Sequence, residues 1–232
     1  LDPQSNASMG CGITDSKNKT IRQVLLNEIN ILEACIHLPF GFSLIPADNN
    51  LTGLQIQLLR FNQQEQILKQ ALQSIKDNYD FIFIDCPPTL STLTLNALVA
   101  ADSVLIPVQC EYYSLEGLAG LLSTIDQCRH TVNTKLTIEG LLRTMYDSRN
   151  RLSLEVSEQL KQHFPNQIYK TIIPRNVRLA EAPSHGRPAK QYAKNSQGAK
   201  AYLALAIEVL RDQLPEALPP SNLMEQLWLK QT

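Results

Sequence analysis

Five short apolar runs, each closed by a polar residue or a proline, limit the fold of this chain more than any other feature. The clearest is Phe81-Ile-Phe-Ile-Asp85, in which four bulky apolar residues end in an acid and are followed by Cys-Pro-Pro. Runs that are apolar at every position are typical of strands buried on both faces, as in a parallel sheet covered by helices. The other four predicted strands are residues 42–46, 103–108, 136–145 and 169–174.

Helical patterns lie between these runs. Residues 63–76, for example, place Ile67, Leu68, Leu72 and Ile75 at helical spacing. Alternating strands and helices with short connections predict right-handed crossovers and an α/β fold with a doubly wound, mostly parallel sheet. Residues 183–198, rich in Pro, Gly, Ser and Lys, predict a surface loop. The other predicted helices are residues 92–101, 114–130, 152–163 and 199–214, so that residues 1–214 form one α/β domain and residues 215–232 a short tail.

Composition excludes several classes of protein. Apolar residues make up 44% of the chain, which is enough to build a core and argues against a disordered tail. No apolar run approaches the roughly 18 residues that a membrane span needs. The five cysteines are widely spaced, contain no CxxC pair and have no histidine at ligand spacing, which favours a reduced, cytoplasmic protein without a zinc site.

The net charge of −1 conceals a strong asymmetry. Residues 1–128 carry 6 basic and 13 acidic side chains, whereas residues 129–200 carry 13 basic and 5 acidic ones. Because salt screens fields beyond about 10 Å, the distant acidic half cannot cancel this basic segment for a bound polyanion. A solvated face of alternating charges is the alternative interpretation.

Two aspartates are candidates for phosphate chemistry. Asp85 ends an apolar strand, the position from which nucleotide-hydrolysing proteins hold Mg²⁺, often through water. Asp2 precedes Pro3, which favours an extended backbone at the end of a strand. The alternatives are a turn after the strand for Asp85 and an Asx turn for Asp2.

Several longer blocks carry a resemblance. LDPQSNAS, FIFIDCPPTLSTLTLNAL, VLIPVQCEYYSLEGL, TMYDSRNRLS and IPRNVRLAEAPSHGRP occur in this order. Together they resemble the ParA/Soj family of chromosome- and plasmid-partitioning ATPases over residues 1 to about 210. These proteins belong to the deviant Walker A ATPases, which also include the cell-division regulator MinD.

The resemblance implies an ATP site with Mg²⁺. Asp2 matches the switch I aspartate that helps to position the attacking water. Asp85 matches the Walker B aspartate that supports Mg²⁺ through water, and Cys86 begins switch II. The adenine pocket would be formed by Met145, Pro174 and Asn176.

The resemblance also implies partners. Arg149 and Arg178 match arginines that bind double-stranded DNA without sequence preference, with help from lysines such as Lys170, Lys190 and Lys194. Relatives of this kind form a homodimer with ATP, and a ParB-type centromere-binding protein stimulates their hydrolysis. The implied location is the cytoplasm, in association with the nucleoid.

One motif of the family is absent from this sequence. No G-K-[ST] occurs, although the family places its glycine-rich phosphate loop before the strand that ends at Asp2. We therefore expect an N-terminally incomplete sequence that lacks the first strand, the P-loop and the first helix. A relic that binds DNA or a partner without nucleotide is an alternative. MinD-like membrane association is less favoured, because residues 222–231 place apolar residues on one face but lack a Lys/Arg-rich polar face.

Overall fold

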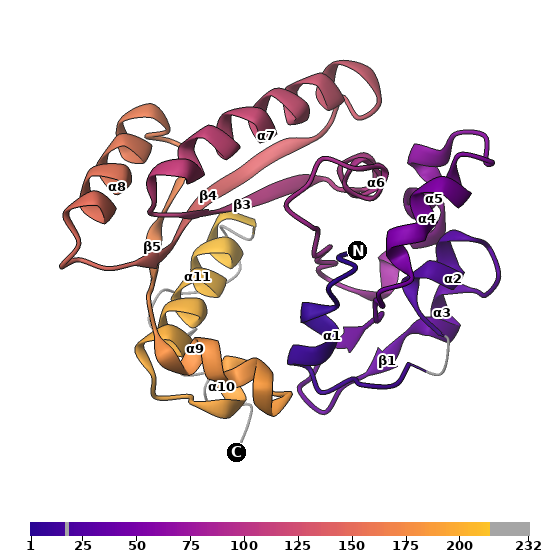
Figure 1. Ribbon diagram of the computed structural model, residues 1–232, viewed down its shortest axis with the longest axis horizontal. Coiled ribbons are helices and arrows are strands. Elements are labelled where there is room, and N and C mark those ends of the chain that lie inside the picture. Colours follow the sequence, from indigo (N-terminus) through magenta and orange to yellow (C-terminus); the bar gives the residue numbers. More distant parts are fainter. Residues whose placement is uncertain (17–18, 214–232) are drawn as a thin grey trace.

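The computed structural model describes residues 1–213, apart from residues 17 and 18. Its elements form two groups, residues 1–100 and residues 101–213, which lie on opposite sides in Figure 1. No helix in the described part of the chain is both long enough and apolar enough to cross a membrane. The predicted tail, residues 215–232, lies outside the described residues.

The second group contains the predicted parallel sheet. β3 (Ser103–Gln109), β4 (Thr137–Tyr146) and β5 (Ile168–Pro174) pair in that order, and both pairs are parallel. α7 (Tyr112–Thr131) and α8 (Arg151–His163) lie on one side of this sheet and α11 (Gln197–Gln213) on the other (Figure 1). The α/β class, three of the five strands and these three helices are thus confirmed.

Alternating residues of β4 serve the two faces of the sheet. Leu141 packs in a cluster with side chains of α7 and α8, whereas Leu142 packs with Leu205 of α11. Because successive side chains of a strand point to opposite faces, both sides of β4 are buried, as the uninterrupted apolar run requires.

The two edges of this sheet differ. Glu208 of α11 accepts hydrogen bonds from the backbone nitrogens of Lys170 (2.7 Å) and Thr171 (2.9 Å) of β5. These contacts satisfy donors that an edge strand otherwise leaves open. β3, at the other edge, pairs only with β4 within the described residues.

The first group is built from short elements. Its two strands, β1 (Ile36–His37) and β2 (Ser43–Leu44), form a separate antiparallel pair, so the prediction that residues 42–46 join the parallel sheet is wrong. The predicted helix at residues 63–76 is only partly helical, because 3-10 turns flank α5. The helical elements are α1 (Asn6–Gly10), α2 (Ile21–Leu25), α3 (Ile31–Ala34), α4 (Leu51–Leu58), η1 (Gln64–Gln66), α5 (Ile67–Leu72) and η2 (Lys76–Asn78).

The most strongly predicted strand is not a strand. Residues 81–85 have no strand pairing, and Phe83 is 80% exposed. The backbone nitrogen of Leu1 donates to the carbonyl oxygen of Asp85 (2.7 Å). Ladder hydrogen bonds come from neighbouring strands, and no described strand lies beside this run, so the apolar sequence stays without a sheet.

α6 (Thr92–Ala100) joins the two groups. Its Leu93 belongs to the core of the first group and its Leu98 to the core around β3 and α7. The fully buried Asn96 donates to the carbonyl oxygen of Gln64 (2.9 Å) and accepts from the backbone nitrogen of Leu68 (3.1 Å). A buried amide whose bonds are satisfied in this way fixes η1 and α5 against α6.

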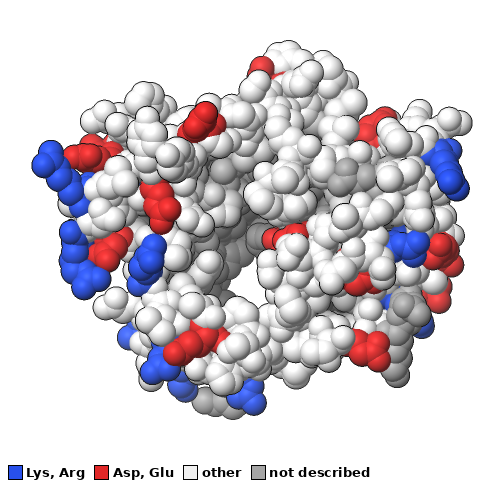
Figure 2. Space-filling model, viewed as in Figure 1, with Lys and Arg blue, Asp and Glu red and all other residues white. Residues whose placement is uncertain are grey.

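A second contact between the two groups of elements is made by backbone atoms alone. Gly12 and Gly186 both have positive φ, and a Cβ atom on Gly186 would lie 2.6 Å from the Cα of Gly12. Gly186 follows η3 (Ala182–His185), and α10 (Ala189–Tyr192) comes next, so the loop predicted at residues 183–198 contains short helices. Between the two junctions the molecule is hollowed, as Figure 2 shows.

Candidate nucleotide and nucleic-acid sites

The carboxyl ends of β4 and β5 bring two predicted adenine-pocket residues side by side. Met145 is the next-to-last residue of β4, and its neighbour Tyr146 pairs with Pro174, the last residue of β5. The backbone nitrogen of Arg175 also donates to the carbonyl oxygen of Tyr146 (2.9 Å). The carboxyl ends of parallel strands are where open α/β sheets bind ligands, so the position suits a ligand pocket.

Met145 has an unusual backbone. Its φ is +51°, in the left-handed region, at an irregularity in the pairing of β4 with β5. Such a conformation costs a non-glycine residue about 1–2 kcal/mol and is concentrated at ligand sites. Its side chain is 40% exposed and therefore open to a ligand.

Asn176 starts α9 (Val177–Glu181) as its N-cap. The side-chain oxygen of Asn176 accepts from the backbone nitrogen of Arg178 (3.0 Å), which leaves the amide NH₂ as its hydrogen-bond donor. Asn176 and Arg178 line one open surface depression of about 550 Å³ with Tyr192, Lys194 and Ser196. A residue predicted to contact adenine, Asn176, and one predicted to contact DNA, Arg178, thus border the same depression.

Asp2 does not end a strand. Its carboxylate accepts from the backbone nitrogen of Gln4 (2.9 Å), and its carbonyl oxygen accepts from the backbone nitrogen of Ser5 (3.0 Å). The strand end expected before Pro3 is absent, and Asp2 forms the Asx turn that was the alternative. The hydrogen bond with Gln4 forms between residues only two apart, whereas a strand must pair with a neighbouring strand.

Asp85 lies close enough to Asp2 for the two charges to interact. Although the residue as a whole is exposed, partial burial of its carboxyl group raises its pKa, the positive amino group of Leu1 lowers it, and the negative charge of Asp2 raises it again. Residues 86–88, the predicted start of switch II, have no regular secondary structure.

This arrangement of carboxylates fits a hydrated Mg²⁺ ion. A divalent cation would relieve the repulsion between Asp2 and Asp85, and Mg²⁺ usually takes one or two carboxylates and keeps water as its other ligands. Across residues 1–16 and 19–213, no group of three or more His, Cys, Asp or Glu side chains could hold a metal. A site made by Asp85 would therefore depend on water and phosphate oxygens.

Both predicted DNA-binding arginines are exposed and paired. Arg149, with a side chain 88% exposed, holds both carboxylate oxygens of Asp147 at 3.0 and 2.8 Å. These hydrogen bonds and the one from the Arg149 backbone lower the pKa of Asp147 to about 2. Arg178, 58% exposed, donates to Glu181 (2.8 Å) and lowers the pKa of that carboxyl group.

Sequence reasoning missed these two acids. Both lie within three residues of their arginine, at the spacings D-x-R and R-x-x-E, and this closeness was the available signal. In Figure 2, basic side chains gather toward the lower left, over α8 to α10, with acidic ones between them. The basic segment is therefore mixed with acids at the surface.

Comparisons with known proteins agree with this architecture. Residues 1–138 match a family model described as an AAA domain. The sporulation initiation inhibitor protein Soj of Bacillus subtilis is 47% identical over 90% of this chain and 83% of its own length. The chromosome partitioning protein ParA of Myxococcus xanthus is 44% identical over 94% of this chain and 77% of its own length.

A solved structure places nucleotide in this fold. Cobyrinic acid a,c-diamide synthase from Mycobacterium smegmatis, with a bound ATP analog and magnesium, matches with a TM-score of 0.76 and 30% identity over 94% of this chain and 83% of that chain. The fold is thus that of P-loop nucleotide-binding proteins. With identities of 44–47% over at least 90% of its length, the chain belongs to the ParA/Soj family of chromosome-partitioning ATPases.

Proposed function

We propose that this protein is an ATPase that segregates DNA, binding ATP with Mg²⁺, dimerising on ATP and coating double-stranded DNA without sequence preference. A ParB-type protein bound at a centromere-like site is the proposed partner that stimulates hydrolysis, and the proposed location is the nucleoid in the cytoplasm. The observation that carries the proposal is the position of Arg149 and Arg178. Both follow the carboxyl ends of strands that also carry Met145 and Pro174.

ATP hydrolysis transfers the γ-phosphoryl group to water, and the protein contributes mainly positioning and electrostatic stabilisation. Asp2 would orient the attacking water, and Asp85 would hold Mg²⁺ through water. Met145 and Pro174 would contact the adenine ring, and the free NH₂ group of Asn176 would donate to it. The shared depression of Asn176 and Arg178 would place nucleotide and DNA contacts a short distance apart.

DNA contacts by Arg149 and Arg178 would be to phosphates. Arginine suits phosphate because its planar fork is always charged. Phosphate contacts fix position and carry no base identity, so binding is expected to be independent of sequence. Two copies of the surface in an ATP dimer act at a high effective concentration, so DNA affinity should increase with ATP.

Calorimetric titration of the full-length protein with ATP and Mg²⁺ tests the nucleotide half of the proposal. Micromolar or tighter binding supports it. Absence of ATP binding with intact DNA binding would instead support a relic that works without nucleotide.

For hydrolysis, Asp2→Asn keeps the acceptor for the Gln4 nitrogen but removes the charge. If this variant hydrolyses ATP as fast as wild type with DNA and partner present, the role of Asp2 is wrong.

A salt series of anisotropy titrations on unrelated duplexes tests the DNA half. Each phosphate contact contributes a slope near −0.9 to log K against log[salt]. Arg149→Ala and Arg178→Ala should each make the slope shallower by about one contact and weaken all duplexes alike. Unchanged slopes in both variants, or preference for one duplex, would mean that the basic segment is only a solvated face and does not bind DNA phosphates.

A further inference from the structure

We propose that Asp147 and Glu181 act as latches that compete with DNA phosphate for Arg149 and Arg178, and so hold the affinity for DNA down. The inference rests on the proposed DNA contacts of these arginines. It goes beyond them because it assigns a role to two acids inside a surface that would bind a polyanion.

The first latch occupies the part of Arg149 that phosphate prefers. The Nε and one terminal nitrogen of Arg149 donate to the two carboxylate oxygens of Asp147, and its backbone nitrogen donates to Oδ1 as well (3.0 Å). Two parallel hydrogen bonds from a guanidinium fork are also the geometry in which arginine binds phosphate. A phosphate that uses this edge must therefore displace Asp147.

The second latch is held in place from a second direction. Oε2 of Glu181 accepts from a terminal nitrogen of Arg178 (2.8 Å) and from the hydroxyl of Tyr192 (3.1 Å). The ring of His185 stacks on Tyr192 with centroids 4.6 Å apart. The carboxylate is thus positioned by α10 as well as by its own helix, and Arg178 meets a fixed negative charge.

The latches are weak enough to open. Ion pairs this exposed contribute little to stability because water and salt screen them. A DNA phosphate can therefore replace either carboxylate, at a cost in affinity of about two- to fivefold per latch. Protonation does not open them near neutral pH, since the pKa of Asp147 is about 2 and that of Glu181 is lowered by Arg178 and Tyr192.

The test measures DNA binding of the full chain, with ATP and Mg²⁺, for Asp147→Asn and Glu181→Gln. Each variant keeps a side-chain oxygen that accepts hydrogen bonds. We expect each to bind unrelated duplexes about two- to fivefold more tightly, with a salt slope steeper by up to about 0.9 for a phosphate newly contacted.

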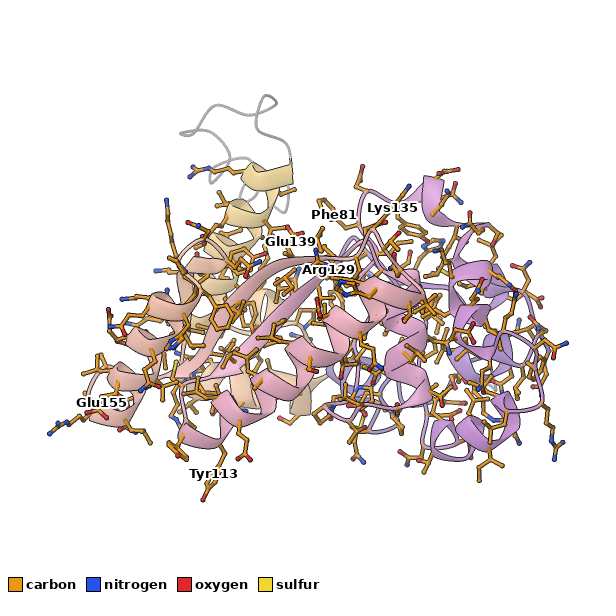
Figure 3. The ribbon with its side chains drawn as sticks, turned by 90° about the horizontal axis from the view of Figure 1, so that it is seen from above. Phe81, Tyr113, Arg129, Lys135, Glu139 and Glu155 are labelled. Atoms are coloured by element: carbon orange, nitrogen blue, oxygen red, sulfur yellow. The ribbon has the colours of Figure 1, made fainter. Side chains whose placement is uncertain are left out.

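Glu155→Gln is the matched control. Glu155 pairs with Arg151 on α8 (2.8 Å), lies at the outer end of the molecule in Figure 3, and its replacement raises the net charge by the same unit. We expect less than a third of the gain seen with the latch variants. An equal gain in Glu155→Gln would assign the effect to net charge and overturn the latches.

Arginine variants separate this inference from the proposed function. If Arg149→Ala and Arg178→Ala leave DNA binding unchanged, or wild type binds no DNA, both the DNA contacts and the latches are wrong. If they weaken binding while Asp147→Asn and Glu181→Gln do not tighten it, only the latches are wrong. Added to Arg149→Ala, the change Asp147→Asn should give no tightening beyond that of the control.

Discussion

The two parts of this molecule obtain their backbone hydrogen bonds in different ways. Residues 101–213 form a parallel sheet whose strands hydrogen-bond to one another through their backbones, and their longest helix has 20 residues. Residues 1–100 form short helices and one pair of two-residue strands, while an apolar run in their midst remains unpaired. A long apolar run therefore becomes a strand only where a neighbouring strand is present, however strong its own preference.

The pKa values of carboxyl groups also differ between the two parts. Asp85, in the first part, has a raised pKa because of its partial burial, and the nearby Asp2 adds to this rise. Asp147, in the second part, has a pKa near 2 because Arg149 donates to it. The acid predicted to support Mg²⁺ thus has a raised pKa, whereas the two acids beside the predicted DNA-binding arginines have lowered ones.

The largest expected effect loosens α6, the helix that joins the two parts, from the elements of the first part. Asn96→Ala leaves the buried backbone nitrogen of Leu68 and the part-buried carbonyl oxygen of Gln64 without this partner. We expect a loss of about 3 kcal/mol in the free energy of unfolding, measured by urea denaturation. The exposed Asn62→Ala is the control, with a change within about 0.5 kcal/mol. Equal changes would show that Asn96 does not anchor α6 against η1 and α5.

The second junction should be the next most sensitive. Gly186→Ala introduces a Cβ 2.6 Å from the Cα of Gly12 at a φ of +58°. We expect a loss of about 2–3 kcal/mol, since the left-handed conformation costs about 1–2 and the backbone must also move. Gly41→Ala isolates the conformational part, because Gly41 has φ +86° and nothing within 4 Å of the added Cβ. Thermal melts that show equal losses would exclude a contribution from the close approach.

In the unpaired run at residues 81–85, substitutions at neighbouring positions should change the stability by different amounts. Ile84 packs on the core of the first part, whereas Phe83 is 80% exposed. We expect Ile84→Lys to cost about 2 kcal/mol and Phe83→Lys to change stability by less than about 0.5. Phe83→Lys should also lower the fluorescence of an apolar dye bound to the native protein. A destabilisation by Phe83→Lys as large as that by Ile84→Lys would mean that residue 83 is buried in solution.

The smallest effect concerns protonation. Carbon-detected NMR should find Asp147 titrating near pH 2, and Arg149→Gln should return its midpoint toward the ordinary value of 3.8. Because the folded pKa is depressed, Asp147 favours the fold above pH 4, and this contribution is lost as the pH falls from about 4 to 2. Asp85 has the opposite sign, since a raised folded pKa favours the fold as the pH falls through it. A midpoint near 3.8 in wild type would mean that Asp147 is unpaired in solution.

The sequence predicted those parts of the fold whose neighbours are close along the chain. The strands at 103, 136 and 169 and the helices between them form one continuous series, so their local patterns sufficed. The run at residues 81–85 has the same pattern, but strand pairing depends on a partner that local sequence does not specify.

The candidate site was predictable to a similar degree. Placing Met145 and Pro174 side by side follows from strand ends meeting at one edge of a sheet. The turn at Asp2 was only the alternative prediction, and the positive φ of Met145 and the pairing of Arg178 with Glu181 were missed. The turn and the ion pair depend on side-chain bonds over two or three residues, which compete closely with other conformations. The φ of Met145 accompanies an irregularity in the pairing of β4 with β5.

The unlike edges of the parallel sheet set a limit on how copies of this chain can assemble. Glu208 occupies two amides of β5, so a head-to-tail pairing of β3 on one copy with β5 on the next would have to expel that carboxylate. Strand addition at the β5 edge therefore competes with Glu208, which protects this edge against the addition of further copies.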